Sequence, residues 1–165
     1  FTNKAAQEMR DRVNAVVPRS AVWVSTFHSF GIRLMRQYAE VFGLERNFTI
    51  FDQSDRAKVI KDALESANVD ANRYPPDRIE HAISKAKNKL QSPESFAAKA
   101  VDFFDQVVAR VYPIYQKRLR DQNGVDFDDL LCYPALAMRH NAEFRASLDE
   151  RFRYVMVDEI GRAHV

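Results

Sequence analysis

Apolar side chains recur every three or four positions along most of the chain, and this spacing predicts a mainly helical protein. Several residues mark the expected helix boundaries: Gly43 fits a C-cap, Asp52 or Ser54 fits an N-cap, and Asn123-Gly124 breaks the pattern. The resulting prediction places helices at residues 4–16, 28–42, about 54–67, about 76–90, 92–121, 126–139 and 142–151.

Two short runs are rich in β-branched and aromatic residues instead, and they predict buried strands at residues 21–26 and 154–157. Residues 48–51 alternate briefly and are expected to form a third, short strand. The stretch 52–121 has almost no strand signal but carries its own apolar stripes. We therefore expect an α/β fold, in which a parallel sheet covered by helices is interrupted by an all-helical insert.

The composition is that of a globular protein, with 46% hydrophobic and 29% charged residues among 165. No run of 18 apolar residues occurs, so no membrane span is expected. The single cysteine, Cys132, has no partner for an internal disulfide, and neither zinc-type spacing nor a secretory leader is visible. These features favour a cytoplasmic protein. Because the chain begins at Phe1 rather than at a methionine, we expect it to be truncated.

The formal net charge of +2 is unevenly distributed. Residues 73–120 hold ten Lys and Arg against five Asp and Glu, whereas residues 121–165 hold five against nine. Within the basic segment, Lys85 and Lys89 share one helical face and Lys87 points elsewhere. This arrangement suits contacts with nucleic-acid phosphates, although a solvated lysine-rich face would have the same pattern.

The last predicted strand ends in Asp158-Glu159, and an apolar strand followed by this pair is typical of a Walker B site. An aspartate fixed at the carboxyl end of a strand can hold Mg²⁺ through water beside nucleotide phosphates. The neighbouring glutamate can orient and deprotonate a water molecule. Many strands also end in acidic residues simply because the chain enters solvent there, so the pair alone does not establish a nucleotide site.

Two other segments combine small polar residues with aromatic side chains at the start of a predicted helix. Phe1-Thr2-Asn3-Lys4 precedes the first helix, and Ser25-Thr26-Phe27-His28-Ser29 joins the first strand to the second helix. Helix N-termini with free N–H groups suit phosphates, and an exposed phenylalanine suits a nucleobase. The same residues could instead serve as helix caps around a partly buried histidine. No Gly-x-Ser-x-Gly motif is present, which argues against a nucleophilic serine.

Three carboxylates fall within four residues, at Asp126, Asp128 and Asp129. Such a cluster could bind a metal ion, but its spacing fits no calcium-binding loop. Asp126 is also well placed to cap the following helix, and acidic residues in a first turn are favoured by the helix dipole. Both interpretations fit the residues.

In chain order, these segments resemble the superfamily 1 DNA helicases of the UvrD/Rep/PcrA type. The resemblance rests on FTNKAAQEMRDRV, which is similar to motif Ia, VSTFHSFGIRLMR to motif Ib, VDFDDLL to motif Ic, and YVMVDE to the start of motif II. The segments NFTIFDQSD, ISKAKNKL and YQKRL are similar to the helical insert of these proteins and its flanks. The likeness covers about residues 1–159, and the motifs are specific jointly rather than singly.

The resemblance implies a RecA-like motor domain, 1A, formed by residues 1–51 and 122–159 and split by an all-helical insert, 1B, at residues 52–121. It implies an ATP- and Mg²⁺-dependent helicase that moves 3′ to 5′ on single-stranded DNA and unwinds duplexes at ss/ds junctions, in repair or replication. Asp158 would serve Mg²⁺ through water, and Glu159 would activate water. The expected DNA-binding residues are Phe1, Thr2, Asn3, Thr26, Phe27, His28, Lys85, Lys87 and Lys89.

The sequence also departs from the family pattern. An aromatic residue, a glutamine and an aspartate normally follow the Asp-Glu pair, whereas residues 160–165 read Ile-Gly-Arg-Ala-His-Val and are expected to be a non-native tail. No Gly-Lys-Ser/Thr phosphate loop occurs, so the chain alone is expected to be inactive as an ATPase. Two alternatives stay open: the helicase portion of a RecB/AddA-like helicase-nuclease, and a non-enzymatic helical DNA-binding module. Under the helicase interpretation, residues 126–129 would be mainly structural or bridging.

Overall fold

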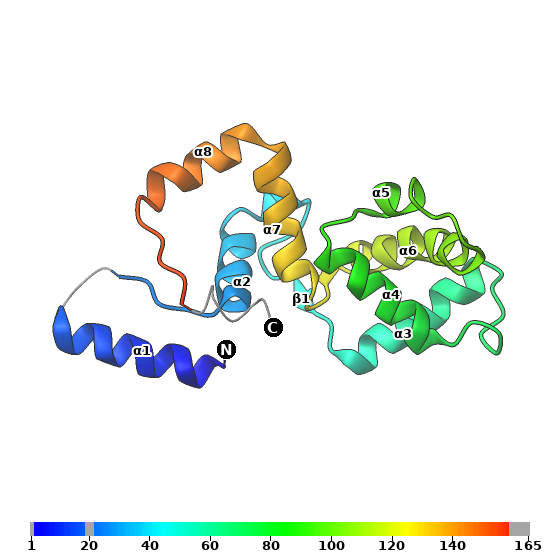
Figure 1. The fold of residues 1–165 in the computed structure, drawn as a ribbon, viewed down its shortest axis with the longest axis horizontal. Coiled ribbons are helices and arrows are strands. Elements are labelled where there is room, and N and C mark those ends of the chain that lie inside the picture. The colour runs from blue at the N-terminus through cyan, green and yellow to red at the C-terminus, as the bar shows by residue number, and fades with distance from the viewer. Residues whose placement is uncertain (1, 19–21, 159–165) are drawn as a thin grey trace.

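The computed structural model describes residues 2–18 and 22–158, which form two groups of packed helices and a small parallel sheet (Figure 1). In chain order the elements are α1 (Asn3–Val16), α2 (Phe27–Gln37), the 3-10 helix η1 (Ala39–Phe42), β1 (Thr49–Ile50), α3 (Gln53–Ser66), α4 (Pro76–Asn88), α5 (Pro93–Ala97), α6 (Phe103–Asp121), β2 (Gly124–Val125), α7 (Asp129–His140) and α8 (Ala142–Arg151). Within the described ranges, no helix is long and apolar enough to cross a membrane. The fold is compatible with part of an α/β domain.

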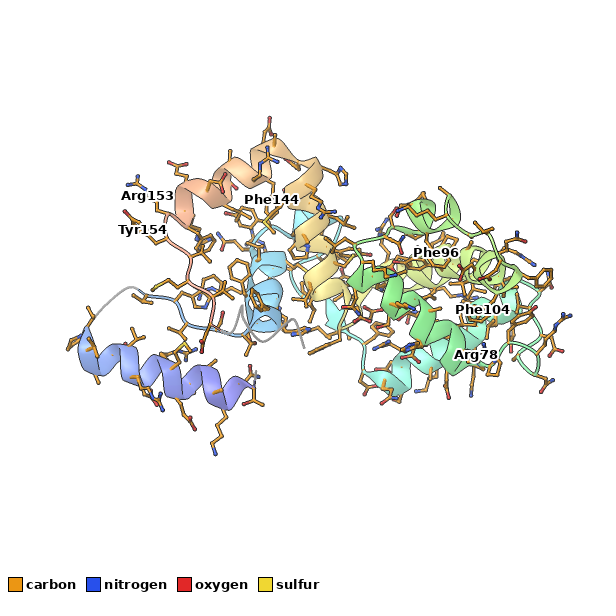
Figure 2. All side chains as sticks on the ribbon, in the orientation of Figure 1. Arg78, Phe96, Phe104, Phe144, Arg153 and Tyr154 are labelled. Atoms are coloured by element: carbon orange, nitrogen blue, oxygen red, sulfur yellow. The ribbon has the colours of Figure 1, made fainter. Side chains whose placement is uncertain are left out.

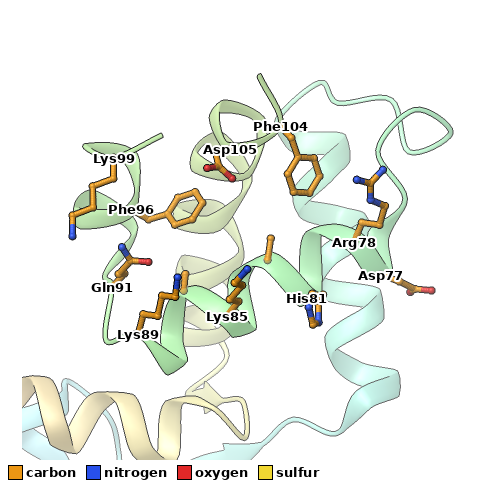
Figure 3. Close-up of a pocket in the computed structure, with 12 residues that line it drawn as sticks. Asp77, Arg78, His81, Lys85, Lys89, Gln91, Phe96, Lys99, Phe104 and Asp105 are labelled. Atoms are coloured by element: carbon orange, nitrogen blue, oxygen red, sulfur yellow. The ribbon is translucent and has the colours of Figure 1, made fainter. Parts of the chain in front are cut away.

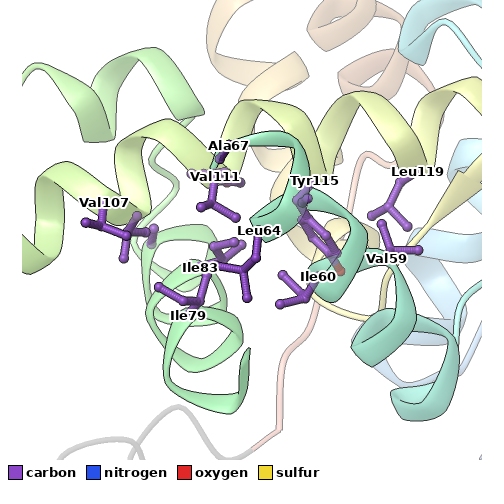
Figure 4. Packing of buried hydrophobic residues seen from close by; sticks show 14 residues of the cluster. Val59, Ile60, Leu64, Ala67, Ile79, Ile83, Val107, Val111, Tyr115 and Leu119 are labelled. Atoms are coloured by element: carbon purple, nitrogen blue, oxygen red, sulfur yellow. The ribbon is translucent and has the colours of Figure 1, made fainter. Parts of the chain in front are cut away.

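Helices α3, α4, α5 and α6 form a helical block around the largest cluster of buried residues in the described chain (Figure 4). Ile60, Ile79, Val108 and Leu119 are each 0% exposed at its centre. Apolar residues three and four positions apart give each helix one apolar side, and burying these sides together stabilises the block. This helical block is the segment for which the sequence predicts an all-helical insert.

The chain enters and leaves the helical block at one place, because β1 and β2 pair as parallel strands. Thr49 lies opposite Gly124, and Ile50 lies opposite Val125. A side chain at residue 124 would not fit, since a Cβ there would come within 2.2 Å of the Phe51 ring. The pairing of these two strands therefore fixes both connections of the helical block against the rest of the chain.

A second packed group consists of α2, η1, α7 and α8. Helices α2 and α7 approach closely at Gly31, where an added Cβ would lie 2.0 Å from the carbonyl oxygen of Leu130. Met35 and Leu130 are fully buried there, and Leu34 packs with Phe144 on the side that faces α8. This packing holds the N-terminus of α2 beside the start of α7.

Helix α1 lies to one side of both groups and has no buried residue (Figure 1). It is tied to the chain around α2 by hydrogen bonds: the Arg10 guanidinium donates to the carbonyl oxygen of Val24 at 2.9 Å, and the side chain of Asn3 contacts the N-terminal turn of α2. The position of α1 therefore depends on these polar contacts and on an apolar side that is only half-buried, formed by Ala5, Ala6, Met9 and Val13.

The strands predicted at residues 21–26 and 154–157 are not found: residues 22–26 and 154–157 form irregular chain, and neither run pairs with another strand among the residues described. The side chains of Tyr154 and Met156 are 94% and 93% exposed, and Tyr154 projects outward (Figure 2). A β-rich composition favours a strand only where a neighbouring strand can satisfy its backbone N–H and C=O groups. Neither run has such a paired neighbour in the described chain.

The single long helix predicted over residues 92–121 is also wrong. Helix α5 ends at Ala97, and α6 starts after Asp102, whose carboxylate accepts a hydrogen bond from the backbone N–H of Asp105 at 2.7 Å. The apolar stripe continues across both helices, so the hydrophobic pattern of the sequence does not reveal the interruption between them. The helix predicted over residues 28–42 is divided as well, because α2 ends at Gln37 and the 3-10 helix η1 begins at Ala39. Other boundary predictions are confirmed: Gly43 ends η1 with a left-handed φ of 66°, and Asp52 caps α3.

Candidate nucleic-acid interface

The N-termini of α1 and α2 meet in a cluster of small polar side chains. Thr2 caps α1 by accepting from the backbone N–H of Ala5 at 3.2 Å, and Thr26 caps α2 by accepting from that of Ser29 at 3.2 Å. The Ser29 hydroxyl donates to Oδ1 of Asn3 at 3.1 Å, and the Thr26 hydroxyl lies 2.9 Å from that of Ser29. Two segments that are 23 to 26 residues apart in sequence are thus joined at two helix N-termini.

Aromatic side chains lie next to this polar cluster. Phe27 is 62% exposed, and Phe127 is 51% exposed at the start of the segment that leads into α7. The rings of His28 and Phe127 stack at 3.9 Å between centroids, with an interplanar angle of 20°. Partial burial lowers the pKa of His28, although the charge of Asp128 opposes this shift, so a neutral imidazole is favoured against the phenyl ring. Open aromatic faces beside hydroxyl and amide groups suit stacked bases of a single strand.

Lys87 does not face a nucleic acid, contrary to the sequence-based prediction. Its side chain is 1% exposed and points from α4 into the interior, where Nζ lies 2.6 Å from Oδ2 of Asp126 and 2.7 Å from Oδ1 of Asp129. Lys85, on the same helix, and Lys89, its C-cap residue, are exposed. The spacing of lysines along α4 thus separates one buried cation from two surface cations.

The two carboxylates around Lys87 are held by further hydrogen bonds. The Tyr115 hydroxyl donates to Asp126 at 2.8 Å, and the Gln116 amide donates to Asp129 at 3.1 Å, both from α6. Asp126 and Asp129 also cap each other: the backbone N–H of each donates to the side chain of the other, at 3.1 and 2.9 Å. These contacts favour the structural interpretation of the two aspartates over metal binding, and no His, Cys, Asp and Glu cluster in the described residues could hold a metal ion.

Burial and the ammonium group act in opposite directions on these carboxylates. Burial alone would raise the pKa of Asp126, but Lys87 and several hydrogen bonds outweigh it and lower that pKa. For Asp129, burial dominates over Lys87 and raises the pKa to about 6, with the negative charge of Asp126 adding to the effect. Asp126 is therefore the permanent anionic partner of Lys87, and Asp129 is the member of the cluster that can be protonated in mild acid.

Lys85 and Lys89 border a pocket on the helical block (Figure 3). Its volume is about 620 Å³, and its walls also carry Arg78 and Lys99. None of these four cations forms an ion pair within the described part of the chain, whereas Lys87 on the same helix does. Lys85 and Lys89 therefore remain available for contacts with phosphate groups.

The predicted nucleotide-site residues are described only in part. Asp158 is exposed at the end of the irregular run that follows α8. Glu159 and residues 160–165 lie outside the described residues, as does Phe1.

The contribution of Phe127 to the aromatic surface was not predicted from the sequence, although its place between two capping aspartates is a signal that its backbone is fixed.

The sequence of residues 1–160 matches the UvrD/REP helicase N-terminal domain. Similar curated proteins include an ATP-dependent DNA helicase PcrA of Staphylococcus epidermidis, which is 44% identical over 161 residues that cover 96% of this chain and 22% of that protein. An ATP-dependent DNA helicase PcrA of Staphylococcus aureus is 41% identical over 161 residues, with the same shares of each chain. The chain thus spans 22% of the length of these curated relatives.

Proposed function

The chain belongs to the UvrD/REP helicase N-terminal domain family, and we propose that it forms the DNA-gripping part of a cytoplasmic, ATP-dependent helicase that moves 3′ to 5′ on single-stranded DNA. In the whole protein, ATP hydrolysis would drive unwinding at ss/ds junctions during repair or replication. The observation that carries this proposal is the junction of α1 and α2, where capped helix N-termini meet open aromatic rings.

We propose that Thr2, Asn3 and Thr26 direct hydroxyl and amide groups toward the DNA backbone, while Phe27 and His28 offer stacking surfaces to bases. Stacking on aromatic rings tolerates every base, and contacts with phosphates are also independent of sequence. Such a surface suits a motor that must move along any strand. Lys85 and Lys89 would add phosphate contacts from the helical block, and Lys87 takes no part in them because it is buried.

We further propose that residues 1–51 and 122–159 belong to a RecA-like domain 1A, and that residues 52–121 are its insert 1B. The parallel pairing of β1 with β2 supports a single connection point for such an insert. Tyr154 and Met156 are almost fully exposed although they are apolar, which supports pairing of their segment with further strands of the whole protein.

Asp158 fits a role in holding Mg²⁺ beside ATP, because its carboxylate is exposed directly after the apolar run at residues 154–157. A bound Mg²⁺ would neutralise charge on the phosphates. Asp158 would hold it through water, and Glu159 would orient the attacking water.

Replacement of Phe27 by Ala tests the proposed DNA surface. We expect affinity for a single-stranded oligonucleotide to fall roughly tenfold, since stacking contributes about 1–3 kcal/mol per base. Fluorescence anisotropy over a range of salt concentrations measures this, and the affinity of the unchanged chain should fall steeply with salt because phosphate contacts release counterions.

The matched control is Phe103→Ala, because Phe103 is 65% exposed and lies at the end of α6 far from β2. This variant should bind as the unchanged chain does. Equal loss of affinity in both variants, or binding that salt does not weaken, would contradict the proposed surface. Circular dichroism shows whether either variant has lost its helices.

A further inference from the structure

We propose that Lys87 is a positioning residue for the DNA surface: from inside the helical block it fixes the segment that carries Phe127, and it thereby keeps Phe127 stacked on His28. This inference rests on the proposed function, because it assigns Lys87 a role in how that surface is built. The role differs from direct contact with DNA, for which Lys87 has no exposed surface.

The first observation is that Lys87 joins two parts of the fold. Lys87 belongs to α4 of the helical block, whereas Asp126 and Asp129 lie 39 and more residues later, where β2 leads into α7. Both carboxylates lie within 2.7 Å of one ammonium group, and all three side chains are at most 1% exposed. Charges that are removed from water need such partners, so the ammonium and the carboxylates hold one another in place.

The second observation is that the residues bound to Lys87 lie on both sides of Phe127. Asp126 and Asp129 cap each other through their backbone N–H groups, which closes residues 126–129 into one turn. Phe127 lies within that turn, so its backbone is fixed while its ring extends toward His28 at 3.9 Å. The direction of the ring is thus set by a turn that the buried ammonium holds.

The third observation is that, of the links between the helical block and this turn, those of Lys87 are the short ones between opposite charges. Tyr115 and Gln116 of α6 also donate to Asp126 and Asp129, at 2.8 and 3.1 Å, but both donors are neutral. Arg56 lies 3.9 Å from Asp128, and the Asn88 amide lies 3.5 Å from it, and both of these separations are at the outer limit for such contacts. Arg56 is engaged mainly with Glu80, at 2.7 Å. Among the described contacts, those of Lys87 are therefore the short, buried ion pairs that would position Phe127, and the hydrogen bonds from Tyr115 and Gln116 act on the same two carboxylates.

The experiment compares two oligonucleotides of equal length, one of thymidines and one with abasic sugars, because both have the same phosphates and only the first can stack. The ratio of the two affinities measures stacking. The slope of log affinity against log salt concentration measures phosphate contacts. Lys87→Met should lower the ratio roughly fivefold to tenfold and leave the slope unchanged.

Lys85→Met in α4 and Lys89→Met at its C-cap are matched controls. Each should reduce the salt slope by about one and leave the stacking ratio unchanged. If Lys87→Met behaves like these controls, Lys87 contacts phosphates and the positioning role is overturned. An unchanged ratio with an unchanged slope overturns it as well.

Lys87→Met leaves two buried carboxylates without their cation, so it is compared with Lys87→Arg and with Lys87→Met combined with Asp126→Asn and Asp129→Asn. Lys87→Arg keeps the positive charge but places it on a guanidinium group of different shape. The triple variant removes the ammonium group and both carboxylate charges, so that the interior is neutral. Both should fold, as circular dichroism can show, and both should keep a lowered stacking ratio. Recovery of the full ratio in the neutral variant would show that only charge balance matters, and would overturn the inference.

A measurement without DNA separates failure of this inference from failure of the proposed function. The pKa of His28, followed by NMR and assigned with His28→Gln, should lie below its ordinary value in the unchanged chain and rise toward 6.5 when Lys87 is replaced. An unshifted titration in all Lys87 variants would overturn the positioning role even if DNA binds. If the unchanged chain does not bind single-stranded DNA, the proposed function fails, and the His28 titration still tests whether Lys87 positions Phe127.

Discussion

Asp129 is a fully buried carboxyl group whose pKa, raised mainly by burial, is about 6, and its protonation should affect stability. The folded state keeps a proton on Asp129 up to about that pH, whereas the unfolded chain releases it near 3.8. The free energy of unfolding should therefore fall as pH rises from about 4 to about 6, by about 3 kcal/mol for this group. Asp129→Asn should lack this fall, as urea unfolding at pH 4, 5, 6 and 7 can measure.

The comparison is made against Asp121→Asn, because Asp121 lies on the surface at the end of α6. That control should keep the pH dependence of the unchanged chain. Curves of the same shape for Asp129→Asn and the unchanged chain would show that Asp129 does not take up a proton on folding.

At the scale of single residues, the sequence predicted candidate residues for the proposed interface but not the environment of each. Thr26 and Asp126 were recognisable as caps because a cap depends on residues three positions away. The burial of Lys87 was not recognisable, because its partners lie 39 and more residues later in the chain. Lys85, Lys87 and Lys89 look alike in sequence, and only tertiary packing separates the buried one from the exposed ones.

Among the elements, helices were predicted well because their apolar spacing and caps are local. The strands at 21–26 and 154–157 were not, because strand pairing depends on distant segments. The pairing of β1 with β2 illustrates this: Gly124-Val125 reads as a helix-breaking turn in sequence, and only contact with Thr49-Ile50 makes it a strand.

The interruption between α5 and α6 gives a prediction for a single element. Asp102 caps α6 through a 2.7 Å hydrogen bond from the backbone N–H of Asp105, so Asp102→Ala should destabilise the fold by about 1 kcal/mol. Thermal unfolding measures the loss. Val101→Ala is the control, since Val101 is 87% exposed and its side chain has no capping role. If α5 and α6 instead formed one continuous helix in solution, Asp102→Ala would raise stability, because alanine is the better residue inside a helix.

For the whole molecule, the helical block and the second group of helices are separate cores that meet around β1, β2 and the Lys87 cluster. Nearly all of the core of the helical block lies within residues 52–121, the segment that carries its own apolar stripes in the sequence, and the assignment of this segment as an insert stays a prediction. The contact between the two cores was not predicted, because the strands and aspartates that form it lie just outside residues 52–121 and come together only in three dimensions.

The final prediction concerns where the independently folding unit ends. A piece that covers residues 52–121 contains the block core but lacks β1, β2, Asp126 and Asp129, so Lys87 loses its partners. A piece that covers residues 46–129 retains all of them. Both should be helical by circular dichroism, and the longer piece should melt on the order of 10 °C higher, since each kcal/mol shifts the melting temperature of so small a unit by about 4–8 °C. Lys87→Met should remove most of that gain from the longer piece. Equal melting temperatures of the two pieces would show that the contact formed by these strands and aspartates does not stabilise the block.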